Sequence, residues 1–528
     1  MKTIYKNIVL SLMGILALTA CQDDFLDRPS TSQISTGNYY KTKDEIRLAT
    51  AALYGGETWA QFNYSGYLSL GDILAGNSVM QYQGADLVQL NTFTLSGSNQ
   101  NVYSTWSALY NIVSNANLTI LGIQENTPAT VAETDKNAGI AEAKFIRAMA
   151  YYHLTMLWGE VPIIEDNRLF LKKPLVNKHL QKDVFQFIVN DLTFAAANLP
   201  LADSKGRVTQ WSAKGMLSKV YLTLAAFEQT GGGTRNQTYL DLAKTTALDV
   251  IEKSGLELLP VYANLFKSQF NDNQESLFSL QWSATTSWLQ GNQLLTFSPS
   301  KEINPMKDGA WGAMNPSYDL YLNYNSADLR RKPTIMLNGD HYPELNAAGG
   351  GYTATGVAMK KHIIGNEDDN NTPGMSYLGS IEHNALLRLA DVYLIYAEAV
   401  LGNNAKTTDA KALLYFNKIR TRAGLPSVAA LDADVIFKER RVELAFEGQF
   451  WYDLVRLSYS NPQEAINKIN DQQRVMLKYD DKTGIATPES PIGAITPASI
   501  STFTLQLPTS ELTVNPKLTE PAVPYFNK

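Results

Sequence analysis

The chain has 528 residues, of which 45% are hydrophobic and 18% are charged, as expected for a globular protein that buries a large core. The formal net charge of −6 at pH 7 and the lack of a basic stripe exclude the electrostatic surface of a nucleic-acid-binding protein. Aromatic residues are frequent, with 27 Tyr, 19 Phe and 8 Trp, so flat rings are available both for the core and for ligand contacts.

The start of the chain has the pattern of a lipoprotein signal peptide. Two lysines among the first six residues precede an apolar run over 8–18, which is shorter than the roughly 20 residues of a membrane-spanning helix. Small residues then lead to Cys21, in the form of a bacterial lipobox. We expect residues 1–20 to be removed and Cys21 to carry acyl chains that hold the protein at a membrane. Because Cys21 is the only cysteine, the mature chain is expected to have no disulfide and no cysteine metal site.

The next segment is expected to be a tether. Residues 22–40 are polar, contain Pro29 and show no helical period, so residues 21–40 would link the lipid to the body. The body, residues 41–528, is expected to be one domain. It opens with Thr42 and Glu45, which have the spacing of a capping box at the start of a helix.

Apolar residues at helical spacing predict helices over 237–253, 384–401 and 408–423. Two further segments, 139–158 and 211–227, are apolar on more than one face, which predicts helices buried between other helices. Pairing 211–227 with 237–253, and 384–401 with 408–423, gives units of roughly tetratricopeptide size. The pattern therefore indicates helical hairpins in a loose repeat.

Two long regions differ from the helical segments. Residues 55–105 and 255–383 are rich in Gly, Asn, Ser, Pro and aromatic residues, and the run 276–282 is typical of a short strand. Insertions of this length without helices of their own are usually functional loops. We expect a helical scaffold that carries two aromatic loop regions.

The sequence offers no clear catalytic or metal-binding constellation. Its five histidines include no HExxH pair, and the glycine runs at 231–233 and 349–351 lack the ending of a phosphate loop. His153 lies on an apolar helix row, so we expect a core residue with its hydrogen bonds satisfied. The acidic run 367–371 could ligate calcium, but a solvated loop is the favoured interpretation.

The densest cluster of charges is the run 439–447, in which Arg440 and Glu443 fall within an apolar helix stripe. Buried carboxylates can be catalytic, and glycosidases use such groups in pairs. A carboxylate beside an arginine is held ionised, however, which is the wrong state for a general acid. The pattern therefore favours a buried structural ion pair.

Several of these segments together resemble one family. They include CQDDFLDRPS after the predicted cut, AEAKFIRAMAYYHLTMLWGEVPII (141–164), ERRVELAFEGQFWYDLVR (439–456) and LPTSELTVNPKLTE (507–520). In this order they resemble the SusD/RagB family over nearly the whole mature chain. The resemblance implies a mainly α fold, in which tetratricopeptide-like helix pairs form a scaffold and a loop-rich lobe contains short strands.

The resemblance also implies a function. Members of the family are outer-membrane lipoproteins of Gram-negative bacteria, anchored at the cell surface. They act as lids on SusC-like TonB-dependent transporters and pass captured oligosaccharides into the barrel. We therefore expect binding without catalysis, a SusC-like partner and no cofactor, although some relatives hold a structural calcium ion.

In the family the ligand face comes from the loops that follow the first helix and from those in the middle of the chain. Sugar rings present C–H faces that flat aromatic rings complement, and neighbouring amides and carboxylates bind hydroxyl groups. Trp106 and Trp451 are expected to pack in the core instead, and Trp282, in the strand-like run, is expected to be less exposed than Trp288. The expected ligand-binding residues are Trp59, Tyr64, Tyr67, Asp72, Asn77 and Tyr82 in the first region, and Trp288, Trp311 and Tyr318 in the second.

Two alternatives to glycan capture remain at this stage. Some family members bind peptides, and the aromatic loops fit peptide or glycopeptide capture almost as well. A surface hydrolase that uses paired Glu or Asp residues is the least favoured, because the sequence shows no suitable pair. For Trp59 and Trp311, which glycines flank, burial in the core is as consistent with the sequence as ligand contact.

Overall fold

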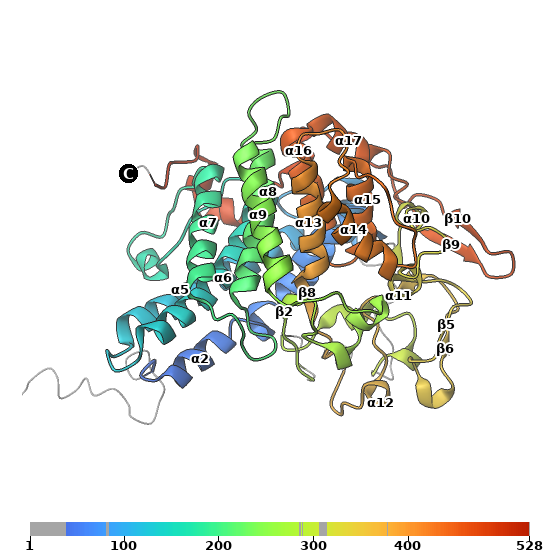
Figure 1. Ribbon diagram of the computed structural model, residues 1–528, viewed down its shortest axis with the longest axis horizontal. Helices are drawn as coiled ribbons and strands as arrows, with labels where there is room; N and C mark the ends of the chain where they lie inside the picture. The colour runs from blue at the N-terminus through green and yellow to red at the C-terminus, as the bar shows by residue number, and fades with distance from the viewer. Residues whose placement is uncertain are drawn as a thin grey trace, which may run out of the picture.

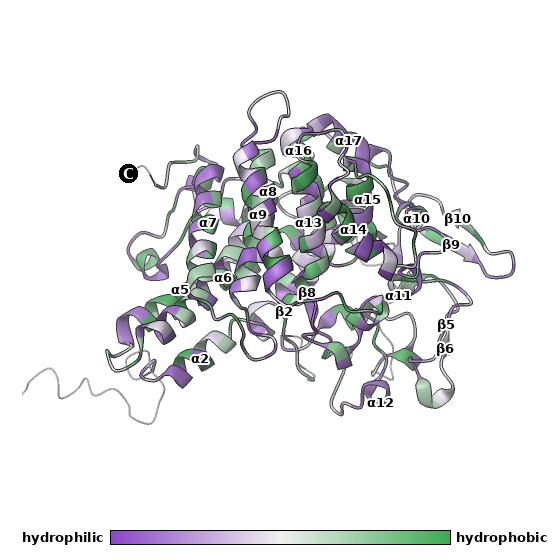
Figure 2. Ribbon diagram, in the orientation of Figure 1, coloured by the Kyte–Doolittle hydropathy of each residue, from purple (hydrophilic) through white to green (hydrophobic). Residues whose placement is uncertain are grey.

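A computed structural model describes residues 39–80, 84–284, 287, 289–305, 314–376 and 379–526. Helices form a layered scaffold, and an irregular lobe with short strands lies along one side of it (Figure 1). Most scaffold helices carry both hydrophobic and hydrophilic residues, as amphipathic helices do (Figure 2). The expected fold class is therefore confirmed. Within the described ranges, no helix combines the length and the apolarity that crossing a membrane requires.

The scaffold consists of helices that pack one against the next along the chain. Pairing of α8 (Gln210–Phe227) with α9 (Gln237–Lys253), and of α13 (Leu389–Leu401) with α14 (Ala410–Arg422), is confirmed. Helix α13 also packs against α9, which joins segments far apart in the sequence. The predicted burial of α6 and α8 on several faces is confirmed as well. The scaffold helices are α5 (Gln100–Asn126), α6 (Glu133–Trp158), α7 (Gln181–Asn198), α8 (Gln210–Phe227), α9 (Gln237–Lys253), α13 (Leu389–Leu401) and α14 (Ala410–Arg422).

The start of the predicted helix over 384–401 is wrong. Residues Asn384–Arg388 form strand β8, which pairs antiparallel with β2 (Ser276–Leu280), and the helix begins only at Leu389. Short apolar runs do not distinguish a strand from the first turn of a buried helix, so the pairing partner decides. Strand β2 itself was expected within 276–282 and is confirmed.

The N-terminal region is more helical than the sequence suggested. The capping box of α2 (Lys43–Ala51) is confirmed, because Thr42 Oγ1 accepts the Glu45 N–H at 3.2 Å and Glu45 Oε2 accepts the Thr42 N–H at 3.0 Å. The expectation of a helix-free loop over 55–105 is wrong. That region contains η2 (Gly56–Thr58), α3 (Ala60–Phe62), the π-helix η3 (Asn63–Ile73), β1 (Ser78–Val79) and α4 (Ala85–Thr92).

The lobe between α9 and α13 is built from short elements around a small core that includes Leu295, Ile303 and Met336. Its helical turns are η5 (Tyr262–Phe266), η6 (Ser268–Phe270), η7 (Gln293–Phe297), η8 (Lys301–Ile303), α10 (Tyr318–Leu322), α11 (Arg331–Thr334), η9 (Ala347–Gly349) and α12 (Glu367–Asn370). Its short strands are β3 (Asn315–Pro316), β4 (Ile335–Met336), β5 (His341–Tyr342), β6 (Tyr352–Thr353) and β7 (Ala358–Met359).

The C-terminal part returns to the scaffold. The chain end packs on the N-terminal half, where Val523 pairs with His179 and the Tyr525 ring meets the His179 ring at 5.0 Å. The elements are α15 (Ala433–Glu443), α16 (Phe450–Ser460), α17 (Pro462–Asn470), the hairpin β9 (Leu477–Asp480) and β10 (Ile485–Pro488), η10 (Ile500–Phe503), α18 (Thr509–Val514) and η11 (Pro516–Thr519). The turn η4 (Asn167–Leu171) lies between α6 and α7.

Buried charges join the scaffold to the lobe. Glu443 is fully buried and binds Arg388 at 2.7 Å, Arg330 at 2.9 Å and also Arg422. Burial alone would raise the pKa of Glu443, but these three guanidinium groups outweigh it and lower the pKa to about 2. Since Arg388 precedes α13, Arg422 ends α14 and Arg330 belongs to the lobe, one carboxylate fixes three parts of the chain.

Arg440 and Glu443 are both buried, as predicted, but they form ion pairs with residues on other elements and not with each other. Arg440 binds Asp391 on α13 at 2.8 Å and Asp453 on α16 at 3.0 Å. His153 is also a core residue, because its Nδ1 lies 2.8 Å from the Met149 carbonyl oxygen and burial lowers its pKa to about 4. All three residues therefore serve the fold.

Candidate ligand-binding site

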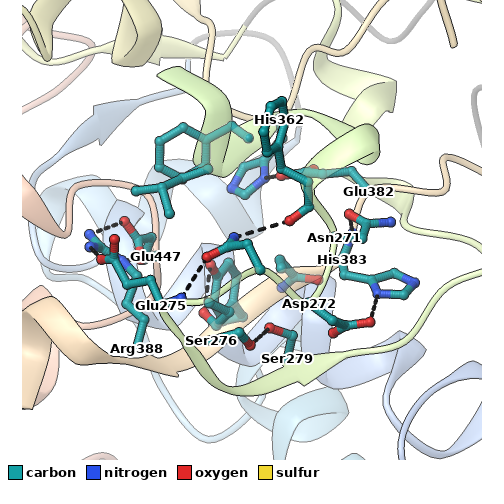
Figure 3. Close-up of a pocket in the computed structure, with 17 residues that line it drawn as sticks. Asn271, Asp272, Glu275, Ser276, Ser279, His362, Glu382, His383, Arg388 and Glu447 are labelled. Atoms are coloured by element: carbon teal, nitrogen blue, oxygen red, sulfur yellow. Dashed lines mark hydrogen bonds and ion pairs between the residues drawn. The ribbon is translucent and has the colours of Figure 1, made fainter. Parts of the chain in front are cut away.

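A polar pocket lies where the lobe meets strands β2 and β8 (Figure 3). Its free volume is about 20 Å³, room for one or two water molecules but not for a sugar ring. Polar side chains line it, among them Asp272, Ser276, Ser279, His362, Glu382, His383, Arg388 and Glu447. The pocket is therefore a small polar joint between the lobe and the scaffold.

The pocket holds a histidine, an aspartate and two serines, but they do not form a catalytic triad. His383 Nδ1 lies 3.1 Å from Asp272 Oδ2, while its Nε2 lies 3.2 Å from the carbonyl oxygen of Trp282. Ser276 and Ser279 bind each other at 2.8 Å. The imidazole is thus turned toward a main-chain oxygen and cannot take a proton from either serine in this arrangement.

A second histidine in the pocket serves as a cross-link. His362 Nδ1 lies 3.0 Å from Glu382 Oε2, and its Nε2 lies 2.9 Å from the Phe446 carbonyl oxygen. Burial would lower the pKa of His362, but the Glu382 carboxylate outweighs it and raises the pKa. Because both ring nitrogens face acceptors, the protonated form is favoured, and the ring joins the lobe to the segment before α16.

A chain of buried amides runs from this joint to the loop over 283–291. Asn292 donates to the Glu382 carbonyl oxygen at 2.9 Å and accepts from Asn63 Nδ2 at 2.9 Å. Asn384 donates to Asn63 Oδ1 at 2.8 Å and accepts from the Trp282 indole at 2.6 Å. Trp282 and Asn292 flank the loop, so the same amide chain fixes both of its ends to the start of η3.

The pairing of strands β1 and β3 fixes the flanks of the segments that contain Tyr82 and Trp311. Strand β1 pairs antiparallel with β3, with Val79 opposite Asn315 and Ser78 opposite Pro316. In the sequence, residues 81–83 follow closely after β1, and residues 306–313 come shortly before β3. The described flanks of these two segments therefore meet at one place on the lobe.

Four of the predicted ligand contacts lie in the interior, and the structure corrects those expectations. Trp59 is fully buried, and its indole donates to the Leu53 carbonyl oxygen at 2.7 Å. Tyr67 is 1% exposed and lines the polar pocket. Asp72 accepts the Gly448 N–H at 2.7 Å and the Asn77 amide at 2.8 Å. Because their side chains are covered by other elements, these four residues cannot touch a ligand at the surface.

The burial of Asp72 has an electrostatic consequence. Burial raises the pKa of Asp72 to about 6, although Asn77 and the main-chain N–H groups of Gly448 and Phe446 favour its charged form. The carboxylate holds the turn before α16, where Phe446 adopts a left-handed conformation with φ of 61°. Its role is to shape that turn.

The remaining predicted residues have different outcomes. Tyr64 is half-buried and stacks on Phe297 with ring centroids 5.9 Å apart, and Tyr318 is half-buried at the start of α10. These two stay candidates for ligand contact. Tyr82, Trp288 and Trp311 lie outside the described residues. Burial of Trp106 and Trp451 is as predicted, and Trp282 is buried as well.

The sequence reasoning missed the residues that support the site. Asn63, Asn292 and Asn384 are each at most 2% exposed and hold the loop ends, yet they lie in segments whose composition is typical of surface loops. The short helix α12 was also missed, since the acidic run at 367–371 was expected to be a loop. Asp369 there accepts the N–H groups of Asn346 and Ala347, so it closes a turn.

Comparisons with known proteins agree with this architecture. The sequence profile of the SusD family matches residues 337–525, and a profile described as starch-binding and associating with the outer membrane matches residues 24–222. A SusD-like protein of Bacteroides ovatus is 37% identical over 548 residues, which cover 99% of both chains. SusD-like protein P25 of Formosa agariphila is 24% identical and covers 85% of this chain and 89% of its own.

Solved structures extend the likeness to the tertiary level. A crystal structure described as containing a xylogluco-oligosaccharide superposes with a TM-score of 0.84 at 36% identity, and covers 92% of this chain and all of the other. A laminarin-binding SusD-like protein superposes with a TM-score of 0.66 at 24% identity, over 90% of this chain and 98% of the other. The second likeness concerns the fold alone.

Proposed function

Since the chain belongs to the SusD family, we propose that it captures oligosaccharides at the cell surface and delivers them to a SusC-like TonB-dependent outer-membrane transporter. The observation that carries the ligand class is the 36% identical structure described with a xylogluco-oligosaccharide, which matches this chain over 92% of its length. A xyloglucan-type oligosaccharide is therefore the first ligand to test.

The proposed contact residues are Tyr64, Tyr318, Tyr82, Trp288 and Trp311. Aromatic platforms complement the C–H faces of sugars, and each aromatic contact adds roughly 0.5–1.5 kcal/mol beyond the area it buries. The half-buried Tyr64 stacked on Phe297 supports this assignment, because its ring is pre-ordered by a neighbour. The amide chain and the β1–β3 pairing support it as well, because they fix the flanks of the segments that carry the other rings.

The proposed function is binding without turnover. Retaining and inverting glycosidases need a carboxylic acid with a raised pKa beside the scissile bond. Burial would raise the pKa values of Glu443 and Glu447, but neighbouring cations outweigh it and lower both. These cations are Arg422, Arg388 and Arg330 at Glu443, and Arg388 and Lys361 at Glu447. Asp72 has a raised pKa but is enclosed by main-chain N–H groups.

The proposed location is the outer membrane, through acyl chains on Cys21 and the tether over 21–40. The signal-peptide pattern of residues 1–20 supports lipidation, and the family profile described as associating with the outer membrane supports the location. Copurification with a TonB-dependent barrel from solubilised outer membranes tests the partner. Recovery of the protein without any such barrel would contradict it.

Calorimetry with xylogluco-oligosaccharides tests the ligand, using Trp288→Ala/Trp311→Ala as the variant. Loss of two platforms is expected to abolish measurable binding while the unfolding temperature stays the same. Tyr103→Ala is the matched control, since Tyr103 is a 38% exposed aromatic residue on the scaffold helix α5 and is not among the proposed contacts. Unchanged affinity in the double variant would refute the site assignment. If the protein binds peptides and no glycan, the proposed oligosaccharide capture is refuted and peptide capture takes its place.

A further inference from the structure

The loop between α6 and α7 exposes an unusual set of side chains. Leu169 is 62% exposed, Leu171 is 89% exposed and Leu175 is 40% exposed. Lys172 and Lys173, which lie between these leucines, are exposed as well. We refer to residues 167–175 as the leucine loop. Exposed leucines beside lysines are typical of segments that enter the boundary between lipid headgroups and acyl chains.

The leucine loop is held in a defined conformation. Its turn η4 is capped by Asp166, and the N–H of Lys173 donates to the Leu169 carbonyl oxygen at 2.8 Å. Arg168 binds both Asp166 and Glu125, so its charge is already balanced. Lys172 and Lys173 are thus the cations that the loop exposes to solvent beside its leucines.

The loop and the tether are attached to the same stretch of α5. Asn117 on α5 binds Asn167 at 3.0 Å, and Glu125 near the end of α5 binds Arg168 at 2.9 Å. Along the same stretch, the Tyr40 ring lies against Gly122, and Lys41 Nζ donates to the Asn126 carbonyl oxygen at 2.8 Å. At 1.5 Å per helical residue the stretch from 117 to 126 is about 15 Å long. The tether therefore enters the body beside the leucine loop, at the end of the molecule where Figure 1 shows α2 and α5.

We propose that the leucine loop rests on the lipid surface of the membrane that holds the protein. The inference rests on the proposed lipidation of Cys21, and it adds a second contact that orients the body. The leucines enter the acyl boundary, and the lysines bind headgroup phosphates. Near an anionic surface each lysine strengthens such a contact by about fivefold. The 17 residues from 22 to 38 can span at most about 60 Å, so the anchor on Cys21 can lie within reach of the loop.

The single cysteine makes a direct test available. In the lipidated full chain Cys21 is consumed, so a cysteine introduced elsewhere is the only free thiol. Leu171→Cys places a nitroxide spin label on the loop, and Leu414→Cys places one on α14, where the side chain is 53% exposed on a different part of the scaffold. Both proteins are reconstituted in vesicles of phosphatidylcholine with phosphatidylglycerol. The measurement compares the collision rate of the spin label with oxygen, which dissolves in lipid, and its collision rate with a water-soluble nickel chelate.

The label at 171 is expected to be reached by oxygen and shielded from nickel, whereas the label at 414 is expected to show the reverse. Adding Lys172→Glu and Lys173→Glu to the Leu171→Cys protein is expected to remove the shielding in these vesicles. Equal accessibility at 171 and 414, in protein that floats with the vesicles, would overturn the inference. Wild-type protein that reacts with the thiol label or does not float would instead contradict the lipidation, and with it the premise of the loop contact.

Discussion

Replacing Asn63 by leucine tests whether the buried amide chain fixes the candidate site. Asn63 is fully buried, donates to Asn292 Oδ1 at 2.9 Å and accepts from Asn384 Nδ2 at 2.8 Å. Leucine has a similar volume, so the change removes two hydrogen bonds without opening a large cavity. The two partners are themselves at most 2% exposed, so they stay buried after the substitution.

The cost follows from what each partner retains. Asn384 Nδ2 loses its acceptor, and a buried donor left unpaired costs roughly 1–3 kcal/mol. Asn292 Oδ1 still accepts the Leu294 N–H at 3.1 Å, so the loss of its hydrogen bond from Asn63 costs only about 1 kcal/mol. We expect the free energy of unfolding to fall by about 2–4 kcal/mol. Oligosaccharide binding should weaken as well, since Asn292 and Trp282 flank the loop over 283–291.

Urea denaturation of wild type and Asn63→Leu measures the first effect, and calorimetry measures the second. Asn111→Leu, on the exposed face of α5, is the matched control and is expected to change stability by no more than about 0.5 kcal/mol. If Asn63→Leu were as stable as Asn111→Leu, the amide chain would not fix the loop ends. If Asn63→Leu is less stable than wild type but binds the oligosaccharide with unchanged affinity, the amide chain stabilises the fold and does not affect ligand binding.

Three further predictions concern buried contacts that join separate parts of the chain. Glu443→Gln leaves three buried arginines short of a charge and should lower the free energy of unfolding by about 3–5 kcal/mol, as chemical denaturation at neutral pH would show. The pKa of Glu443 is about 2 in the folded protein, below the ordinary 4.5, so between these pH values the folded state binds fewer protons than the unfolded state. Glu443 therefore contributes about 3 kcal/mol to the free energy of unfolding above pH 4.5, and this contribution is lost as the pH falls toward 2. The stability difference between wild type and Glu443→Gln should therefore shrink over that pH range, and a constant difference would contradict the assignment. Gly71→Ala would place a Cβ 2.6 Å from Gly448 Cα and should cost about 1–3 kcal/mol in a thermal melt, whereas Gly356→Ala, with open space around it, should cost far less.

Much of the scaffold was predictable because its signals are local. Thr42 and Glu45 satisfy each other's main-chain groups across three residues, and the apolar spacing in α8 and α9 repeats within each helix. The candidate site was less predictable. Trp59 and Tyr67 have the composition of a loop around them, yet both rings are buried. Trp59, between η2 and α3, packs against Phe278 of β2, and Tyr67 belongs to η3, which packs against α5, so tertiary packing decides which aromatic rings are covered.

The sequence by itself determined the helical pairs, the buried character of Arg440 and Glu443 and the membership of the family, because each depends on spacing along the chain or on a run of neighbouring residues. Only the tertiary structure decided which residues Glu443 binds, which asparagines hold the loop ends, and that Tyr40 and Lys41 contact α5 beside the leucine loop. These contacts join residues up to several hundred positions apart. A buried polar group accepts whichever partner the fold brings within about 3 Å, and no local pattern names that partner.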